Sequence, residues 1–184
     1  MTGIPPRFVT RAITTAAPVT DLTELRGAYG DNSGLARELT GITARPKDQT
    51  PEQRRRYQAT LRQLQRQARG QRPATNLRPG LDRLGRRLGE QRRIDQFRRT
   101  GVHVTFNGSL KVSQKVDPRA RWINWHIPAS QLGPFLRDAE AHRWSRASSE
   151  LEQAFLNEYG IGRAAEIDHT NSLALSTERK TGWA

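Results

Sequence analysis

The sequence predicts an α+β protein, with an N-terminal helix-turn-helix module followed by a small antiparallel sheet that two helices cover. Between residues 50 and 72, apolar side chains recur at the spacing of a helix, whereas from Gly101 onward they alternate with polar ones as in a strand. The charge changes at the same place. Residues 1–100 hold 21 basic and 9 acidic side chains and residues 101–184 hold 10 and 9, so nearly all of the formal net charge of +13 lies in the first half. Hydrophobic residues make up only 34% of the chain, which favours small packed modules over one large core.

The first 20 residues are expected to form a flexible basic arm. They are rich in Thr, Ala and Pro, have no periodicity that would indicate a helix or a strand, and contain Arg7 and Arg11. Basic arms of this kind are known to enter the minor groove of DNA.

A helix-turn-helix module is predicted in residues 21–79, opened by a short helix at 22–29. The stretch LARELTGI (35–42) has a compact apolar face that includes Ala36, which is small enough for a second helix to cross closely. Residues 43–50 then form a connection longer than the usual three or four residues. Either the turn is expanded, or the second helix begins early.

The second helix of the module is the expected DNA-recognition helix, at residues 51–69. Thr50, Pro51 and Gln53 form a typical N-terminal capping sequence. An apolar stripe at helical spacing is predicted to be buried: Tyr57, Leu61, Leu64 and Ala68. Guanidinium and amide groups cover the other side, and they suit phosphates and base edges in the major groove, although a solvated basic face shows the same pattern. The expected DNA-binding side chains are Arg54, Arg55, Gln58, Arg62, Gln65, Arg66 and Arg69, with Arg72 and Arg78 in the connector that follows.

Residues 80–100 are expected to form a basic connecting helix. Its inward side chains are predicted to be Leu81, Leu84, Leu88 and Ile94. Gly85 and Gly89 weaken this helix by about 1 kcal/mol each relative to alanine. We therefore expect a marginal helix that contact with phosphates would stabilise.

Residues 101–175 are expected to form a β-β-β-α-α-β domain that serves a protein partner or dimerisation. In GVHVTFNGSLKVS, the pair Asn107 and Gly108 lies between two alternating stretches and predicts a tight hairpin turn. The elements expected after this hairpin are a strand in RARWINWHI, helices at 131–143 and 150–159, a short strand at 164–168 and a tail at 176–184.

Three aromatic residues of this domain allow two interpretations. Phe106, Trp122 and Trp125 are expected to pack in the core or on a sheet face, with Trp122 facing away from Trp125. The alternative is that they stack on the bases of a single strand, as in other sheet platforms. The near-neutral charge of this half argues against a strong independent nucleic-acid site.

The composition points away from several classes of protein. The chain contains no cysteine, and its four histidines lack the spacing of metal ligands, so neither a metal site nor another cofactor is expected. No paired carboxylates, nucleophile–base arrangement or phosphate loop is found, so no catalytic residue is assigned. No membrane span or export signal is recognised, and the bacterial cytoplasm, at the nucleoid, is the expected location.

The order of these parts resembles the telomere terminal proteins of linear actinobacterial chromosomes and plasmids. The resemblance rests on LARELTGI (35–42), on the Arg-rich helix that runs into RGQRP (69–73), and above all on three stretches of the second half. These are GVHVTFNGSLKVS, RARWINWHIPASQLGPFLRDAEA and ELEQAFLNEYG. The resemblance covers roughly residues 33–170, with low identity and no invariant motif. It implies a DNA-binding protein of linear replicon ends, with a replication or telomere-associated protein as a partner.

The resemblance also implies a hydroxyl side chain, in the loop after the hairpin, that accepts the first nucleotide of a DNA strand. In this chain the corresponding loop, residues 114–118, contains no Ser, Thr or Tyr. The nearest hydroxyl is that of Ser113, which is the candidate nucleotide acceptor, and Ser109 is the next.

Three functions remain open on the sequence. The first is a terminal-protein type of DNA-binding protein that recognises duplex DNA or folded single-stranded ends. The second is a helix-turn-helix regulator of a plasmid or an integrative mobile element, in which a homodimer would bind two half-sites. The third is an RNA-associated or ribosome-associated basic protein, because charge alone does not distinguish RNA from DNA.

Overall fold

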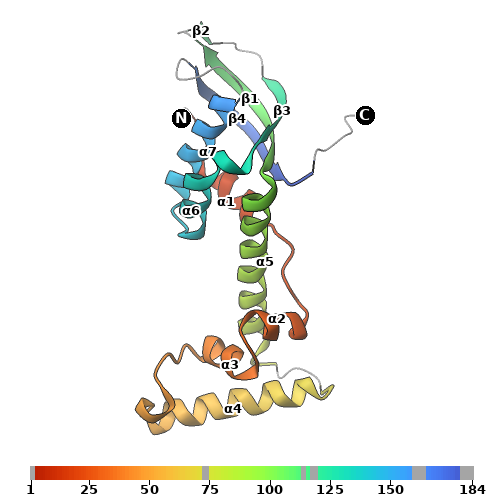
Figure 1. Cartoon of the computed structure of the whole chain (residues 1–184), viewed down its shortest axis with the longest axis vertical. Helices are drawn as coiled ribbons and strands as arrows, with labels where there is room; N and C mark the ends of the chain where they lie inside the picture. Colours follow the sequence, from red (N-terminus) through yellow and green to blue (C-terminus); the bar gives the residue numbers. More distant parts are fainter. Residues whose placement is uncertain (1–2, 72–74, 113–114, 117–119, 159–164, 179–184) are drawn as a thin grey trace. The chain divides into compact units, whose positions relative to one another are not determined.

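The computed structural model describes residues 3–71, 75–112, 115–116, 120–158 and 165–178, and it shows an α+β protein (Figure 1). The predicted class is therefore confirmed: helices precede an antiparallel sheet. The chain divides into two compact units. One is a helical unit of residues 17–89, and the other is an α+β unit of residues 3–16 and 90–178 within the described part.

The helical unit contains α2 (Leu22–Ala28), α3 (Asn32–Thr40), α4 (Pro51–Ala68) and the first part of α5 (Arg78–Thr100). In α2, the Asp21 carboxylate accepts hydrogen bonds from the amides of Thr23 and Glu24, so Asp21 is the cap. In α4, the Gln53 amide donates to the Thr50 hydroxyl and the Thr50 amide donates to the Gln53 side chain, at 3.2 and 3.0 Å. The predicted capping box is confirmed.

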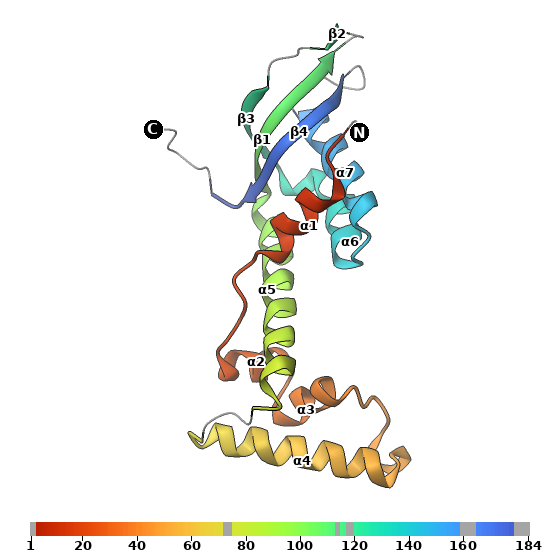
Figure 2. The same ribbon diagram turned by 180° about the vertical axis from the view of Figure 1, so that it is seen from behind.

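One small core holds the helical unit together. Leu35 and Ala36 of α3 are fully buried and belong to the same cluster as Leu64 of α4. In both views α3 lies along α4 (Figures 1 and 2). The other buried members are Val19, Leu25, Leu77 and Leu84. The unit thus reaches beyond the predicted limits of 21–79 at both ends, because Val19 and Leu84 complete its core.

The connection between α3 and α4 is expanded. Gly41 ends α3 in the left-handed conformation, with a φ of 67°. A 3₁₀ turn at Pro46–Asp48 follows, and α4 begins only at Pro51. Gln49 is buried and donates to the carbonyl oxygen of Ala44 at 3.1 Å, which fixes the connection. Of the two predicted alternatives, the expanded turn is correct.

The glycines of α5 have a packing role that helix propensity does not show. The Val19 amide donates to the carbonyl oxygen of Gly85 at 3.0 Å, so an extended segment lies directly on the helix. A Cβ atom at Gly85 would overlap the carbonyl oxygen of Val19, and one at Gly89 would overlap that of Ala17. These positions require glycine because another backbone approaches there.

Gly85→Ala is therefore expected to lower the free energy of unfolding by about 1–3 kcal/mol, although alanine is the better helix former. The displaced carbonyl of Val19 outweighs the gain in propensity of about 1 kcal/mol. Urea unfolding checks this. Gly27→Ala, in α2, is the matched control, because nothing lies within 4 Å of its added methyl group. If Gly85→Ala stabilised the protein as much as Gly27→Ala, the close approach would not matter.

The α+β unit begins with a helix where a flexible arm was expected. Residues Pro6–Thr14 form α1, in which Val9 and Ile13 are fully buried. The prediction of an arm is wrong because proline was counted against structure, whereas Pro6 occupies the first turn of a helix, where no amide is required. The preceding residues are also anchored: the Ile4 amide donates to the Glu152 carboxylate at 3.1 Å.

The sheet is antiparallel and is built around β1 (Val102–Val112). One edge of β1 pairs first with β3 (Arg121–Ile127) and then with β2 (Lys115–Val116), and the other edge pairs with β4 (Ala165–Ser176). The two strands predicted on either side of Asn107 and Gly108 are one strand, β1, and the short β2 follows it. The last strand, β4, is much longer than the strand expected at 164–168.

The predicted hairpin turn at Asn107 and Gly108 is wrong. The strand β1 runs straight through both residues, and its register with β4 shifts between them. Gly108 lies so close to β4 that a Cβ atom would overlap the carbonyl oxygen of His169. Gly108 is therefore needed at a β-bulge where two backbones approach closely, which is a common reason for glycine inside a strand.

Two helices cover one face of the sheet, as predicted, although their limits differ. They are α6 (Gly133–Glu140), preceded by a 3₁₀ turn at Ala129–Gln131, and α7 (Trp144–Glu158). Both lie on the same side of the sheet in the two views (Figures 1 and 2). Phe106 of β1 meets Phe155 of α7 with ring centroids 5.7 Å apart. Phe97 of α5, which the periodicity did not single out, is also fully buried in this core.

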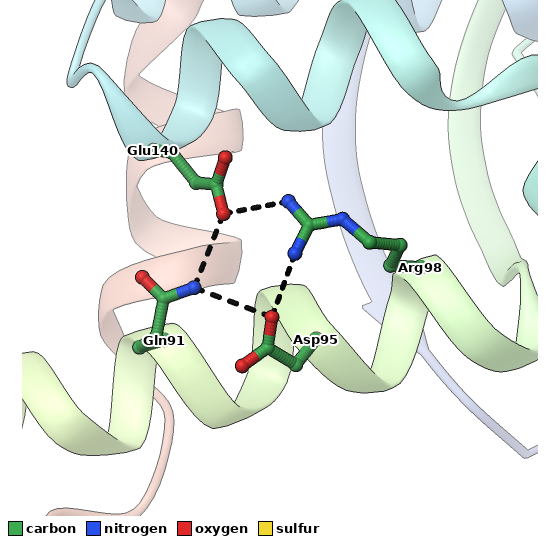
Figure 3. A network of polar contacts seen from close by, with 4 residues as sticks. All are labelled: Gln91, Asp95, Arg98 and Glu140. Atoms are coloured by element: carbon green, nitrogen blue, oxygen red, sulfur yellow. Dashed lines mark hydrogen bonds and ion pairs between the residues drawn. The ribbon is translucent and has the colours of Figure 1, made fainter.

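A polar network joins the second part of α5 to α6 (Figure 3). Arg98 donates to Asp95 at 2.7 Å and to Glu140 at 2.6 Å, and Gln91 donates to the same two carboxylates. Hydrogen bonding to Arg98 lowers the pKa of Glu140 below its usual value. The side chains remain 47% and 31% exposed, so water weakens the attraction between them.

This network predicts a small loss of stability in acid. Because the pKa of Glu140 is lower in the folded protein, its contribution is complete above the unfolded pKa and disappears as the pH falls through the folded pKa. Glu140→Gln should therefore reduce the difference in unfolding free energy between pH 7 and pH 3 by less than about 1 kcal/mol. Urea titrations at both pH values measure it. If Glu140→Gln and the unaltered protein showed the same difference between pH 7 and pH 3, Glu140 would not contribute to the pH dependence of stability.

Candidate nucleic-acid interface

The helix α4 buries one narrow side and exposes the rest. Thr60 and Leu64 are buried, and Tyr57 and Leu61 are half-buried against the same core. The predicted stripe is thus correct for its first three members. Ala68 is exposed, because the helix ends there at its last turn, and Thr60 takes part in the buried side instead.

The predicted DNA-binding side chains of α4 all lie on its exposed surface. These are Arg54, Arg55, Gln58, Arg62, Gln65, Arg66 and Arg69. Arg78, at the start of α5, is exposed as well, whereas Arg72 lies outside the described residues. Glu52 is the single acidic side chain of α4. A row of guanidinium groups with so little neutralising charge produces a positive local potential.

Four of these side chains surround one open hollow of about 520 Å³ on the first half of α4. Arg54, Arg55, Gln58 and Arg62 line it together with Pro51 and Ala59. Guanidinium groups bind phosphate oxygens in a bidentate manner, and glutamine presents both a donor and an acceptor. The hollow therefore offers several anion-binding donors and one amide that can distinguish base edges.

The connection before α4 adds basic residues that were not among the predicted DNA-binding side chains. Arg54 reaches back and donates to the carbonyl oxygen of Pro46 at 3.4 Å, so the 3₁₀ turn lies beside this end of α4. Arg45 and Lys47 are exposed on the connection. Both residues can be seen in the sequence TARPKDQT (43–50), but that stretch was predicted only as a turn, not as part of the interface.

The candidate nucleotide acceptor is not placed. Ser113 lies outside the described residues. The next hydroxyl, that of Ser109, is in β1, is only 8% exposed, and donates to the Asp168 carboxylate at 3.1 Å. Because this hydroxyl is buried, it is not accessible to an external phosphate.

No other type of site is recognised in the part of the chain that the structure describes. It contains no group of three His, Asp or Glu side chains that could hold a metal ion. In the same ranges, no helix combines the length and the apolar character that a membrane crossing requires.

The geometry thus defines an α+β protein whose helical unit presents an Arg/Gln-rich helix. Comparisons with protein-family models, with curated proteins and with solved structures give no significant match.

Proposed function

We propose that this protein binds DNA, with α4 as the helix that docks in the major groove. The observation that carries the proposal is the exposure of seven Arg and Gln side chains along one helix whose opposite side is fixed in a core by Leu64. A helix of this diameter fits the major groove, and its arginines supply both phosphate and base contacts.

The charge distribution supports a nucleic-acid partner. Nearly all of the net charge of +13 belongs to the half that contains α4. Each phosphate neutralised by Arg or Lys releases counterions, so binding of this kind is strong at low salt and falls steeply as salt rises. Arg45, Lys47 and Arg78 are placed to add backbone contacts around those of α4.

Within this proposal, we favour a protein of the terminal-protein type. The order of parts supports it: a basic helical unit comes first and an α+β unit of lower charge second, as in the telomere terminal proteins that the sequence resembles. In this view α4 docks on the ends of a linear replicon, and the α+β unit binds a replication or telomere-associated partner, or a second copy of the chain. The protein would then be located at the bacterial nucleoid.

A helix-turn-helix regulator of a mobile element is the second candidate, and the packing of α3 against α4 in one core supports it. With α4 beginning only at Pro51, the two helices do not follow the usual short turn. A dimeric regulator requires two half-sites one helical turn apart, whereas a terminal protein requires an end.

A salt-titrated binding comparison separates these functions. Four probes of equal length are used: a random duplex, an unstructured single strand, a palindromic single strand that folds into hairpins, and a structured RNA. Tighter binding to the folded strand supports the terminal-protein type. Selection of one internal duplex sequence, with a footprint repeated every helical turn, supports the regulator. Equal binding to a structured RNA would identify an RNA-associated basic protein and contradict both.

A further inference from the structure

The hollow on the first half of α4 combines short apolar side chains with long polar ones. Pro51 and Ala59 are its two apolar lining residues, and both are exposed. Ala59 lies four residues after Arg55 and three before Arg62, so it is their neighbour on the surface of the helix. A single methyl group therefore stands between two guanidinium side chains, and the hollow has an apolar floor inside a polar rim.

The packing of α4 keeps this hollow turned toward solvent. Thr60 and Leu64 are buried on the other side of the helix, and Leu64 belongs to the core of the helical unit. The capping box of Thr50 and Gln53 fixes the first turn, from which the hollow begins. Gln58 cannot turn inward without removing Leu64 from the core, so its exposure is a fixed property of the unit.

The Gln58 amide is available to a ligand. Within the residues that the structure describes, its side chain makes no hydrogen bond, whereas Arg54 donates to the carbonyl oxygen of Pro46 at 3.4 Å. None of the six lining residues is acidic, so the hollow accepts an anionic partner without repulsion. A glutamine amide places a donor beside an acceptor, which is the pattern that matches N6 and N7 of adenine in the major groove.

The apolar floor distinguishes between base pairs. In the major groove, thymine presents a methyl group, whereas a G·C pair presents only polar groups there. A G·C pair over Pro51 and Ala59 would lose water from those polar groups without gaining hydrogen bonds from the floor. The charged rim suits the phosphates that border the groove, which leaves the amide of Gln58 and the methyl group of Ala59 to face the base pair.

We propose that this hollow reads one A·T base pair of duplex DNA, with Gln58 bonded to adenine and Ala59 against the thymine methyl group. Gln58 is then the residue that determines specificity, and the arginines position the helix. The inference rests on the proposed docking of α4 in the major groove. It agrees with the place of the hollow, because the first residues of a recognition helix contact base edges. It also favours DNA over RNA, because uracil lacks the methyl group and the major groove of RNA is too narrow.

Selection from a library of duplexes with a randomised centre tests the role of Gln58. The unaltered full-length protein should enrich an A·T pair at one fixed position. Gln58→Ala should lower the preference for A·T over G·C at that position by about 5- to 100-fold. The salt dependence should not change, because glutamine carries no charge. Gln65→Ala is the matched control: Gln65 is exposed on the same helix seven residues later, does not line the hollow, and should leave the preference intact.

A second measurement tests the contact with Ala59. Deoxyuridine in place of thymine in the selected pair removes one methyl group and should weaken binding to the unaltered protein by about 4-fold. Ala59→Gly should bind both duplexes equally, since it lacks the methyl group that thymine contacts. The two duplexes are compared on the same variant, so any loss of helix stability cancels in the ratio.

The outcomes separate this inference from the function on which it rests. An A·T preference that survives in Gln58→Ala would overturn the inference, and so would an equal loss in Gln65→Ala or enrichment of a G·C pair instead. Duplex binding that depends on salt but shows no base preference would overturn the reading of A·T and leave the docking of α4 in place. Absence of duplex binding by the unaltered protein would overturn both.

Discussion

Replacing Arg62 and Arg66 together with alanine is expected to weaken duplex binding by about 10- to 100-fold at moderate salt. The two side chains are exposed and lie four residues apart, so they are neighbours on the same side of α4. If each neutralises one phosphate, the slope of log affinity against log salt should fall by about 1.8, since each contact contributes about 0.9. Fluorescence anisotropy with one duplex at five salt concentrations measures both quantities.

The control for this variant removes the same charge elsewhere. Arg137→Ala combined with Arg146→Ala deletes two exposed arginines of the α+β unit, on α6 and α7. That variant should keep the salt slope nearly unchanged. If both double variants lost the same affinity and slope, binding would depend on net charge alone, and α4 would have no special place in the interface. An unchanged affinity in the α4 variant would exclude the helix directly.

Gly108→Ala is expected to destabilise the α+β unit by about 2–4 kcal/mol. The added methyl group would overlap the carbonyl oxygen of His169 on β4 and approach the ring of Phe106. Since both strands pair through this region, neither backbone can move without breaking ladder hydrogen bonds. Thermal and urea unfolding, followed by circular dichroism, would show the loss as a lower midpoint.

Gly133→Ala in the same unit is the matched control for this prediction, because nothing lies within 4 Å of the methyl group that it adds. We expect it to be neutral or slightly stabilising, as for an ordinary glycine in a helix. An equally neutral Gly108→Ala would mean that the close approach of β1 and β4 at this position is absent.

The two halves of the chain differ in how far local pattern predicted them. Capping at Thr50 and Gln53 and the buried position of Leu64 are fixed by residues within one or two helical turns, so α4 was predicted almost to the residue. The exposure of its arginines follows from the same periodicity. Arg45 and Lys47 were missed because their place beside α4 depends on a folded connection.

Errors arose where one local signal has two structural meanings. Asn107 and Gly108 predicted a turn, which would have paired the residues before them with those just after them. Instead, these residues all belong to β1, which pairs with β3 and with the distant β4. Gly85 and Gly89 of α5 were predicted to weaken the helix, yet both allow another backbone to approach, and Val19 at Gly85 lies 66 residues earlier in the chain. Pro6 read as a breaker, yet it starts α1.

The sequence by itself determined the α+β class, the basic helical half and the exposed face of α4. These properties depend on periodicity and charge, which are local along the chain. Only the tertiary structure decided which strands pair, which glycines allow close backbone approach, and that residues 6–14 belong to the core of the α+β unit. Those outcomes depend on contacts between residues far apart in the sequence, whose free energies no local pattern records.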